Sequence, residues 1–313
     1  MRIVFCGTPD FAVPSLRQLL ADPGFTIETV VTQPDRPRGR GREVSASPVK
    51  QIAVEAGVPV YQPDKIKADA AYDFFTRVAP DAVVIIAYGQ IIPARLIAIP
   101  RFGWINLHAS LLPKYRGAAP IAWAIANGET TTGLTTMQID EGMDTGPILL
   151  QQSVDIGSGE TAPELAQRMA HAGAPLIVDS LHRLERGDIA PIPQDASQAS
   201  YAPLLKKEHG RVDWKRPAQQ VYNHIRGLAP WPGAFTTFRG QLCHLWGRPA
   251  QPRTVAASQQ TGTLTLEDDT LYVVCGQDTS LELQFVQLEG RKRVTAREFS
   301  NGAHLLPTER FDA

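Results

Sequence analysis

Two alternating patterns of apolar and polar positions run through the first part of the chain. Residues 82–87 form a continuous apolar run, which is typical of a strand buried on both faces of a parallel sheet, and further strands are predicted at 2–6, which is short and apolar, 26–33 and 58–61. Apolar residues at helical spacing predict helices at residues 11–20, 48–56 and 68–78. Strands that alternate with helices form β-α-β units. The pattern therefore predicts an α/β fold with a Rossmann-like, doubly wound and mostly parallel sheet.

The next predicted strand, at residues 104–108, carries two polar side chains on one face. Side chains alternate along a strand, so Asn106 and His108 share a face and their apolar neighbours take the other. A neutral imidazole can accept or donate a proton near pH 7, and an Asn amide can donate hydrogen bonds to an oxygen that becomes negative. A polar pair at a strand end is more often structural than catalytic, but this pair suits acyl or formyl transfer.

An acidic turn at residues 140–146 follows a short helix predicted at 118–126 and an alternating strand predicted at 133–139. Acidic turns are normally solvent-exposed connectors, and the spacing of these carboxylates does not fit a calcium loop. If the turn folds beside His108, the Asp144 carboxylate would orient the imidazole and make it a competent proton shuttle.

Residues 88–93 follow the apolar strand 82–87, at the edge where open α/β sheets bind ligands. Apolar residues beside a glycine there can line a pocket for a flat ring, although such residues are more commonly plain core. No Gly-x-Gly-x-x-Gly follows the first strand, which argues against an NAD site.

Four arginines alternate with Gly and Pro in the segment 34–43. We expect an exposed loop without helix or strand, because Gly and Pro disfavour both. Such a charge run is usually a solvated connector. Alternate arginines can also bind successive phosphates of a nucleic-acid backbone, since each guanidinium can donate a bidentate pair of hydrogen bonds to a phosphate. The two interpretations are about equally supported by the sequence.

The second part of the chain has a different pattern. A capping-box sequence at residues 161–164 opens a helix that ends at Gly187, and residues 188–206 have the Pro- and Ser-rich composition of a linker. Short strands and turns follow, which predict a small β-barrel. We therefore expect domains at 1–187 and 207–313, joined by 188–206. Basic residues at 206–207, 211, 215–216 and 291–293 either form a basic face or are ordinary solvated charge.

Composition narrows the possible classes. A chain of 313 residues suits two domains. The net charge of −1 means that a nucleic-acid partner would need a local basic patch. Three widely separated cysteines do not suggest a disulfide framework or a zinc site. No stretch is long and apolar enough to be a signal peptide or a membrane span, so we expect a cytoplasmic protein without metal.

Several motifs together resemble the folate-dependent formyltransferase superfamily: Asn-Leu-His at 106–108, Ser-Leu-Leu-Pro at 110–113, Arg-Gly at 116–117 and Asp-Thr-Gly at 144–146. The chain is more narrowly similar to the bacterial branch that acts on methionyl initiator tRNA. That similarity rests on the segments 7–12, 33–37, 39–41, 47–50, 116–121 and the tail around 231–232, which occur in order over nearly the whole chain.

The resemblance implies transfer of a formyl group from 10-formyltetrahydrofolate to the amino group of methionine on initiator tRNA. It implies a catalytic trio of Asn106, His108 and Asp144, and a C-terminal barrel of the oligonucleotide-binding (OB) type that assists tRNA binding, in a monomer. It places the folate pocket at Ser110, Leu111, Leu112, Pro113, Tyr88, Gly89, Ile91 and Ile92. It places tRNA contacts at Arg36, Arg38, Arg40, Arg42, Lys206 and Lys207.

One departure concerns the arginine segment. Family members often continue it with Lys-Lys-Leu, whereas Arg42-Glu43-Val44 stands here, and Glu43 weakens the attraction of this loop for phosphate. Two alternatives stay open at this point. A formyltransferase acting on a small amine, such as an amino sugar or a glycinamide nucleotide, would need the same trio without the arginine loop. A non-enzymatic RNA-binding protein would tolerate the loss of His108.

Overall fold

The computed structural model describes residues 1–38, 43–250, 260–306 and 309–312. The chain divides into two compact units. The first comprises Met1–Pro120, Thr131–Asp155 and Leu165–Ala202, and the second comprises Ile121–Thr130, Ile156–Glu164 and Pro203–Ala313. The boundaries expected from composition remain predictions, but residues up to 202 of the expected linker belong to the first unit.

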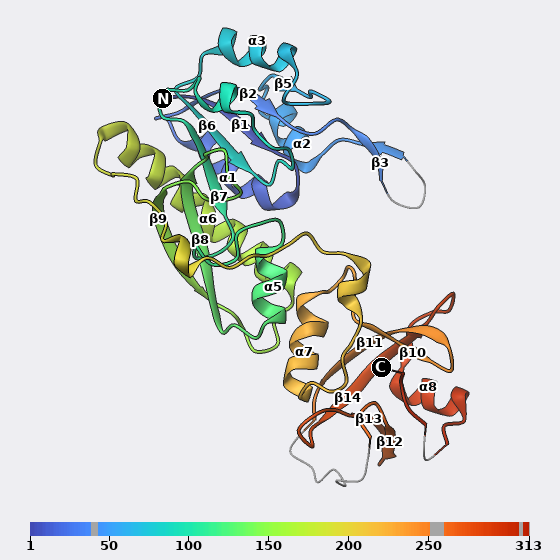
Figure 1. Ribbon diagram of the computed structural model, residues 1–313. Helices are drawn as coiled ribbons and strands as arrows, with labels where there is room; N and C mark the ends of the chain where they lie inside the picture. Colours follow the sequence, from blue (N-terminus) through green and yellow to red (C-terminus); the bar gives the residue numbers. More distant parts are fainter. Residues whose placement is uncertain (39–42, 251–259, 307–308, 313) are drawn as a thin grey trace. The chain divides into compact units, whose positions relative to one another are not determined.

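The first unit is built on a seven-stranded sheet, as the apolar pattern predicts (Figure 1). The strand order is β5-β2-β1-β6-β7-β8-β9, with parallel pairing from β5 to β7 and antiparallel pairing beyond. The strands are β1 (Arg2–Gly7), β2 (Thr26–Val31), β5 (Val60–Tyr61), β6 (Ala82–Ile86), β7 (Trp104–His108), β8 (Thr131–Gln138) and β9 (Ile148–Asp155). The order reverses between β1 and β6, and open α/β sheets bind ligands at such a switch point.

Helices cover both faces of this sheet. Trp104 of β7 packs against Phe75 of α3 and donates its indole N–H to the carbonyl of Leu96 in α4 at 2.8 Å. On the opposite face Leu107 meets Gly173 of α6, where a Cβ would lie 2.5 Å from the leucine side chain. The helices of this unit are α1 (Val13–Ala21), α2 (Pro48–Glu55), α3 (Asp69–Val78), α4 (Ala94–Ile97) and most of α6 (Ala162–Arg186), with short 3-10 turns at Asp10–Ala12 and Ala196–Gln198.

The arginine segment departs from the expectation of an irregular loop, which is wrong for its two ends. β3 (Arg36–Arg38) and β4 (Glu43–Ser45) pair antiparallel, with Pro37 opposite Val44, and β3 projects away from the body of the first unit (Figure 1). Backbone hydrogen bonds across two strands need no buried side chain, so the apolar pattern carried no sign of this hairpin. Residues 39–42, which include Arg40 and Arg42, lie outside the described residues.

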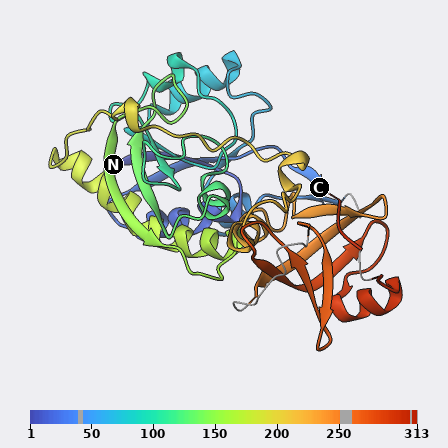
Figure 2. The ribbon, with the colours of Figure 1, turned by 60° about the horizontal axis from the view of Figure 1, so that its bottom comes forward.

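The second unit contains the antiparallel sheet that the short strands predict. Its order is β10-β11-β14-β13-β12, and β15 pairs with β14. The strands are β10 (Phe235–Phe238), β11 (Gln241–Pro249), β12 (Leu264–Glu267), β13 (Thr270–Val274), β14 (Ser280–Leu288) and β15 (Val294–Thr295). The helices are α5 (Pro120–Ala126), α7 (Ala218–Gly227) and α8 (Ala296–Ala303), with a 3-10 turn at Lys207–Gly210. Figure 2 shows α8 beside the curled sheet.

The C-terminal segment joins the two open edges of this sheet. Asp312 donates its backbone N–H to Thr237 of β10, and Phe311 donates to Gly262 just before β12, both at 3.0 Å. Phe311 also stacks on Trp214 inside the core of the unit. The segment therefore satisfies backbone groups that an open sheet would leave exposed. The predicted barrel-like architecture is confirmed as an antiparallel sheet domain. Within the described ranges, no helix is long and apolar enough to cross a membrane.

Candidate active site

The last residue of β7, His108, is held by two contacts. The whole residue is 6% exposed. Nε2 donates to the carbonyl of Tyr115 at 2.9 Å, and because a carbonyl only accepts, this nitrogen carries the proton of the neutral ring. Nδ1 lies 3.6 Å from Oδ2 of Asp144. The ring nitrogen without this proton therefore faces the Asp144 carboxylate.

Asp144 has an unusual backbone conformation in the acidic turn after β8. Its φ is +53°, a left-handed conformation that Asp and Asn tolerate better than most residues. Its Oδ2 accepts the backbone N–H of Gly117 at 2.8 Å. Gly117 itself has φ +120°, and a Cβ there would lie 2.7 Å from the carbonyl of Ala202. Glycine at this position thus lets three chain segments meet beside the imidazole.

Gln194 stabilises the same turn, and the sequence analysis missed it. Its Oε1 accepts from Nε and Nη2 of Arg116 at 3.1 and 2.8 Å. Its Nε2 donates to the carbonyls of Asp144 and Gly146 at 2.9 and 2.7 Å. Gln194 stands in the stretch whose composition predicted a linker, so no local signal marked it.

Asn106 lies on the face of β7 that also carries His108, as alternation predicts. Its side chain is partly exposed, and its amide has no hydrogen-bond partner among the residues that the structure describes. Two N–H donors beside His108 are therefore free to bind a ligand oxygen.

The turn after β7, at residues 110–113, is fixed by internal hydrogen bonds. The hydroxyl of Ser110, which is fully buried, donates to the carbonyl of Lys114 at 2.6 Å, and its own carbonyl accepts from Thr135 at 2.6 Å. The Leu112–Pro113 peptide is cis, and Leu111 packs over Gly133. The polar groups of Ser110 are occupied within the protein, and the folate role of residues 110–113 remains a prediction.

A cavity of about 570 Å³ opens at the carboxyl ends of β1, β2 and β6, which is the switch point of the sheet. Two of the expected folate residues, Tyr88 and Gly89, line it. Ile91 is 88% exposed, and neither it nor Ile92, which is buried, lines the cavity. The other lining residues are mostly polar: Thr8, Pro9, Gln33, Pro34, Arg36, Ser45, Ser47, Asp64, Ala87 and Gln90.

Tyr88 turns its ring into the core and not into this cavity. The side chain is buried in the apolar cluster beneath the sheet, its hydroxyl has no partner, and burial raises its pKa. Its backbone carbonyl accepts from the amide of Gln33 at 3.1 Å. A ligand in the cavity would therefore meet the backbone of Tyr88.

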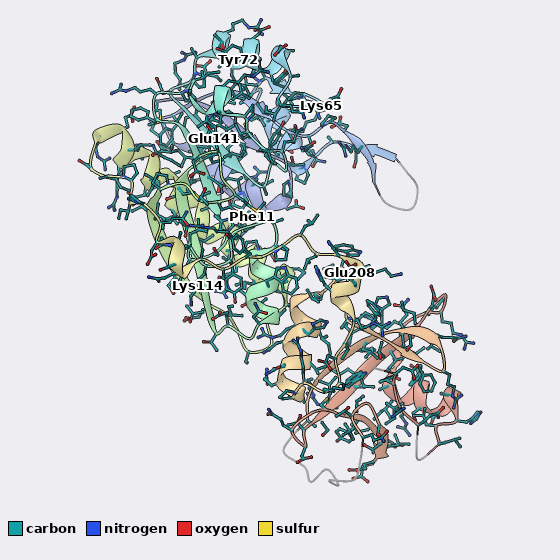
Figure 3. All side chains as sticks on the ribbon, in the orientation of Figure 1. Phe11, Lys65, Tyr72, Lys114, Glu141 and Glu208 are labelled. Carbon is teal, nitrogen blue, oxygen red and sulfur yellow. The ribbon has the colours of Figure 1, made fainter. Side chains whose placement is uncertain are left out.

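The expected tRNA-binding residues lie in both units. Arg36 is exposed at the start of β3 and lines the cavity, and Arg38 ends the same strand. Lys206 and Lys207 are exposed in the second unit, where Lys206 lies 3.9 Å from Glu208 (labelled in Figure 3). The structure describes no group of His, Cys, Asp or Glu side chains that could hold a metal ion.

The base of the β3–β4 hairpin is anchored to the sheet unit. Asp35, which precedes β3, accepts from Nζ of Lys50 at 2.5 Å and from the amide of Gln62 at 2.8 Å. These hydrogen bonds, that of Lys50 first, lower the pKa of Asp35. The orientation of the hairpin is thus set by an ion pair next to its first strand.

Comparison with known proteins shows which family models and which relatives the chain matches. The formyl transferase family model matches residues 1–181, and the model of the formyl transferase C-terminal domain matches residues 204–304. Proteins named methionyl-tRNA formyltransferase are similar over nearly their full length. That of Solibacter usitatus is 51% identical, with 99% of this chain and 98% of the relative covered, and that of Koribacter versatilis is 51% identical, with 96% of each covered.

Solved structures share the fold at low sequence identity. The sugar 3N-formyl transferase WlaRD has a TM-score of 0.66 at 16% identity and covers 93% of this chain and 99% of its own. Glycinamide ribonucleotide transformylase 1 from Symbiobacterium toebii has a TM-score of 0.52 at 18% identity and covers 61% of this chain and 94% of its own. These likenesses concern the fold, whereas the two family matches and the full-length relatives show that the chain belongs to the formyl transferase family.

Proposed function

We propose that this protein transfers the formyl group of 10-formyltetrahydrofolate to the amino group of methionyl initiator tRNA, which gives the N-formylmethionyl-tRNA used in translation initiation. The observation that carries the proposal is the 51% identity, over 99% of the chain, to a protein named methionyl-tRNA formyltransferase. The arrangement of Asn106, His108 and Asp144 supports the same reaction. A cytoplasmic monomer would suit this role.

The chemistry follows from the groups at the end of β7. The neutral amine of the methionyl ester attacks the formyl carbon, and the carbonyl oxygen becomes an oxyanion. The unpartnered amide of Asn106 can donate to this oxygen. The amine must lose a proton as the new C–N bond forms, and Nδ1 of His108 can accept it, because the ring already carries its neutral-state proton on Nε2.

The second half of the reaction returns that proton. The bond between the formyl carbon and the folate nitrogen breaks, and His108 gives the proton to the departing nitrogen. Asp144, 3.6 Å from Nδ1, stabilises the imidazolium that exists between the two transfers. The two steps together move the formyl group from the folate nitrogen to the amine and the proton from the amine to the folate nitrogen. They need no metal or redox step.

In this proposal the two substrates meet at Tyr88 and Gly89, which line the polar cavity and also belong to the predicted folate pocket. The turn 110–113 and residues 88–92 would bind the folate ring. The polar cavity at the switch point, with Arg36 at its rim, suits the ribose and phosphates of the acceptor end of the tRNA. The β3–β4 hairpin would contact the tRNA backbone next to it.

A transfer assay tests the proposal. Labelled formyl should pass from 10-formyltetrahydrofolate to methionyl initiator tRNA and not to uncharged tRNA, a glycinamide nucleotide or an amino-sugar nucleotide. Transfer to a small amine alone would overturn the choice of acceptor. We expect His108→Ala to lower the rate by roughly 10²–10⁴ and Asn106→Ala by roughly 10²–10³. Near-normal turnover in both variants would show that the catalytic assignment is wrong.

A further inference from the structure

An arginine lies across two aromatic rings on the sheet of the second unit. Trp246 of β11 is directly opposite Phe285 of β14. The guanidinium carbon of Arg293, which precedes β15, lies 5.2 Å from the centre of the Trp246 ring and 4.9 Å from that of Phe285. Phe285 is 37% exposed, whereas its neighbour Val286 is buried in the core. This group of three side chains, the Arg293 cluster, therefore lies on the outer face of the sheet.

Stacking leaves the hydrogen-bonding edge of a guanidinium free. A guanidinium held over a ring by a cation–π contact keeps its N–H groups for other partners, and these groups form a planar fork that matches phosphate oxygens. The rings also limit the side-chain motion of Arg293, so less conformational entropy is lost when a ligand binds. The arrangement prepares an anion-binding group on a rigid sheet.

The charge of this cluster is not neutralised by the protein. Two other exposed arginines of the second unit have carboxylate partners: Arg297 lies 3.0 Å from Asp269, and Arg248 lies 2.8 Å from Glu282. In the described part of the chain Arg293 has no carboxylate within 4.0 Å. A cation that the protein leaves unpaired on its surface is available to an external anion.

Two further cations precede Arg293 on the same turn. Arg291 and Lys292 are exposed and, within the described ranges, are likewise without a carboxylate partner. The turn is held by hydrogen bonds from the amide of Gln287 to the carbonyl of Arg291 at 2.9 Å and from the N–H of Arg291 to Leu288 at 3.0 Å. Glu289 is the acidic residue of this turn, which leaves it a net positive charge.

We propose that the Arg293 cluster, flanked by Arg291 and Lys292, is a binding site for the phosphate backbone of RNA, and that it contacts the tRNA substrate. This rests on the proposed function for the identity of the RNA. Phosphates match the guanidinium fork, and the two rings offer stacking surface to an unpaired base. The charge and the aromatic surface together favour RNA over a simple acidic peptide.

Substitution of Arg293 in the full-length chain tests the site. For Arg293→Gln we expect the Kd for methionyl initiator tRNA to rise about tenfold, and the slope of log Kd against log salt to fall by about 1. The KM for tRNA should rise with the Kd. Arg293→Lys should recover only part of the affinity, because lysine lacks the fork. Arg297→Gln is the matched control and should change neither quantity, since Asp269 neutralises Arg297.

The possible outcomes separate this inference from the proposed function. If the wild-type chain formylates the tRNA and Arg293→Gln keeps its Kd and its salt slope, the inference is refuted. If the wild-type chain does not formylate the tRNA, the proposed function fails, while a loss of RNA affinity confined to the Arg293 variants still supports the RNA site. If Arg293→Gln binds anionic lipid vesicles less tightly than the wild-type chain but keeps its affinity for RNA, the cluster binds a membrane surface and the inference is refuted.

Discussion

The role of Asp144 can be tested with a substitution that keeps its shape. Asp144→Asn preserves the size of the side chain, and Asn tolerates the left-handed backbone at φ +53° about as well as Asp. The amide oxygen of Asn can still accept the N–H of Gly117, which Oδ2 of Asp144 accepts at 2.8 Å. The substitution therefore removes the negative charge beside Nδ1 of His108 and little else.

The expected loss follows from the distance between the two groups. Two unit charges 3.6 Å apart interact by about 4.6 kcal/mol at an effective dielectric constant of about 20. This value suits a pair whose side chains are 7% and 19% exposed. If the imidazole carries about half a charge in the transition state, roughly half of that energy, or about 2.3 kcal/mol, is lost. Because about 1.36 kcal/mol corresponds to a factor of ten, kcat/KM should fall about 50-fold.

The assay is the transfer of labelled formyl to methionyl initiator tRNA. Glu141→Gln, on the same turn, is the matched control: Glu141 is exposed (labelled in Figure 3), so loss of its charge should leave kcat/KM within about twofold. A melting curve checks that both variants are folded. If Asp144→Asn retains more than a third of wild-type kcat/KM while His108→Ala is inactive, the carboxylate does not stabilise the imidazolium and the electrostatic argument is wrong.

Three further predictions concern the architecture. Gly117→Ala should destabilise the fold by about 2 kcal/mol and abolish most activity, measured by urea denaturation and formyl transfer, whereas Gly57→Ala, where a Cβ meets no atom within 4 Å, should cost about 1 kcal/mol at most. Burial raises the pKa of the Cys275 thiol to about 12, so iodoacetamide at pH 8 should alkylate it slowly in the native protein and rapidly in urea, as mass spectrometry would show. A hydrogen bond with His182 lowers the pKa of Asp22; the stability that this carboxylate adds is present above the ordinary pKa of about 3.8 and is lost as pH falls, so the melting-temperature gap between wild type and Asp22→Asn should shrink from pH 6 to pH 3.

The apolar runs at residues 2–6 and 82–87 predicted β1 and β6 correctly because these two strands are buried on both faces almost throughout. β9 was not predicted because it lies at the edge of the sheet and its middle residues are exposed, so neither an uninterrupted run nor clean alternation marks it. The β3–β4 hairpin was missed because its short strands, Arg-Pro-Arg and Glu-Val-Ser, show neither an apolar run nor a clear alternation. Elements that bury little surface leave little trace in the hydrophobic pattern.

The sequence alone determined the fold class of both parts and the shared face of Asn106 and His108, because strand alternation and apolar periodicity are local properties. It also offered Asp144 as a partner for the imidazole, but only as a condition on how the acidic turn folds. The tertiary structure shows that the acidic turn does lie beside His108, held there by hydrogen bonds to Gly117 and Gln194. Gln194 lies 50 residues from Asp144 along the chain, and contacts over such separations depend on packing of the whole unit, so no local pattern could reveal them.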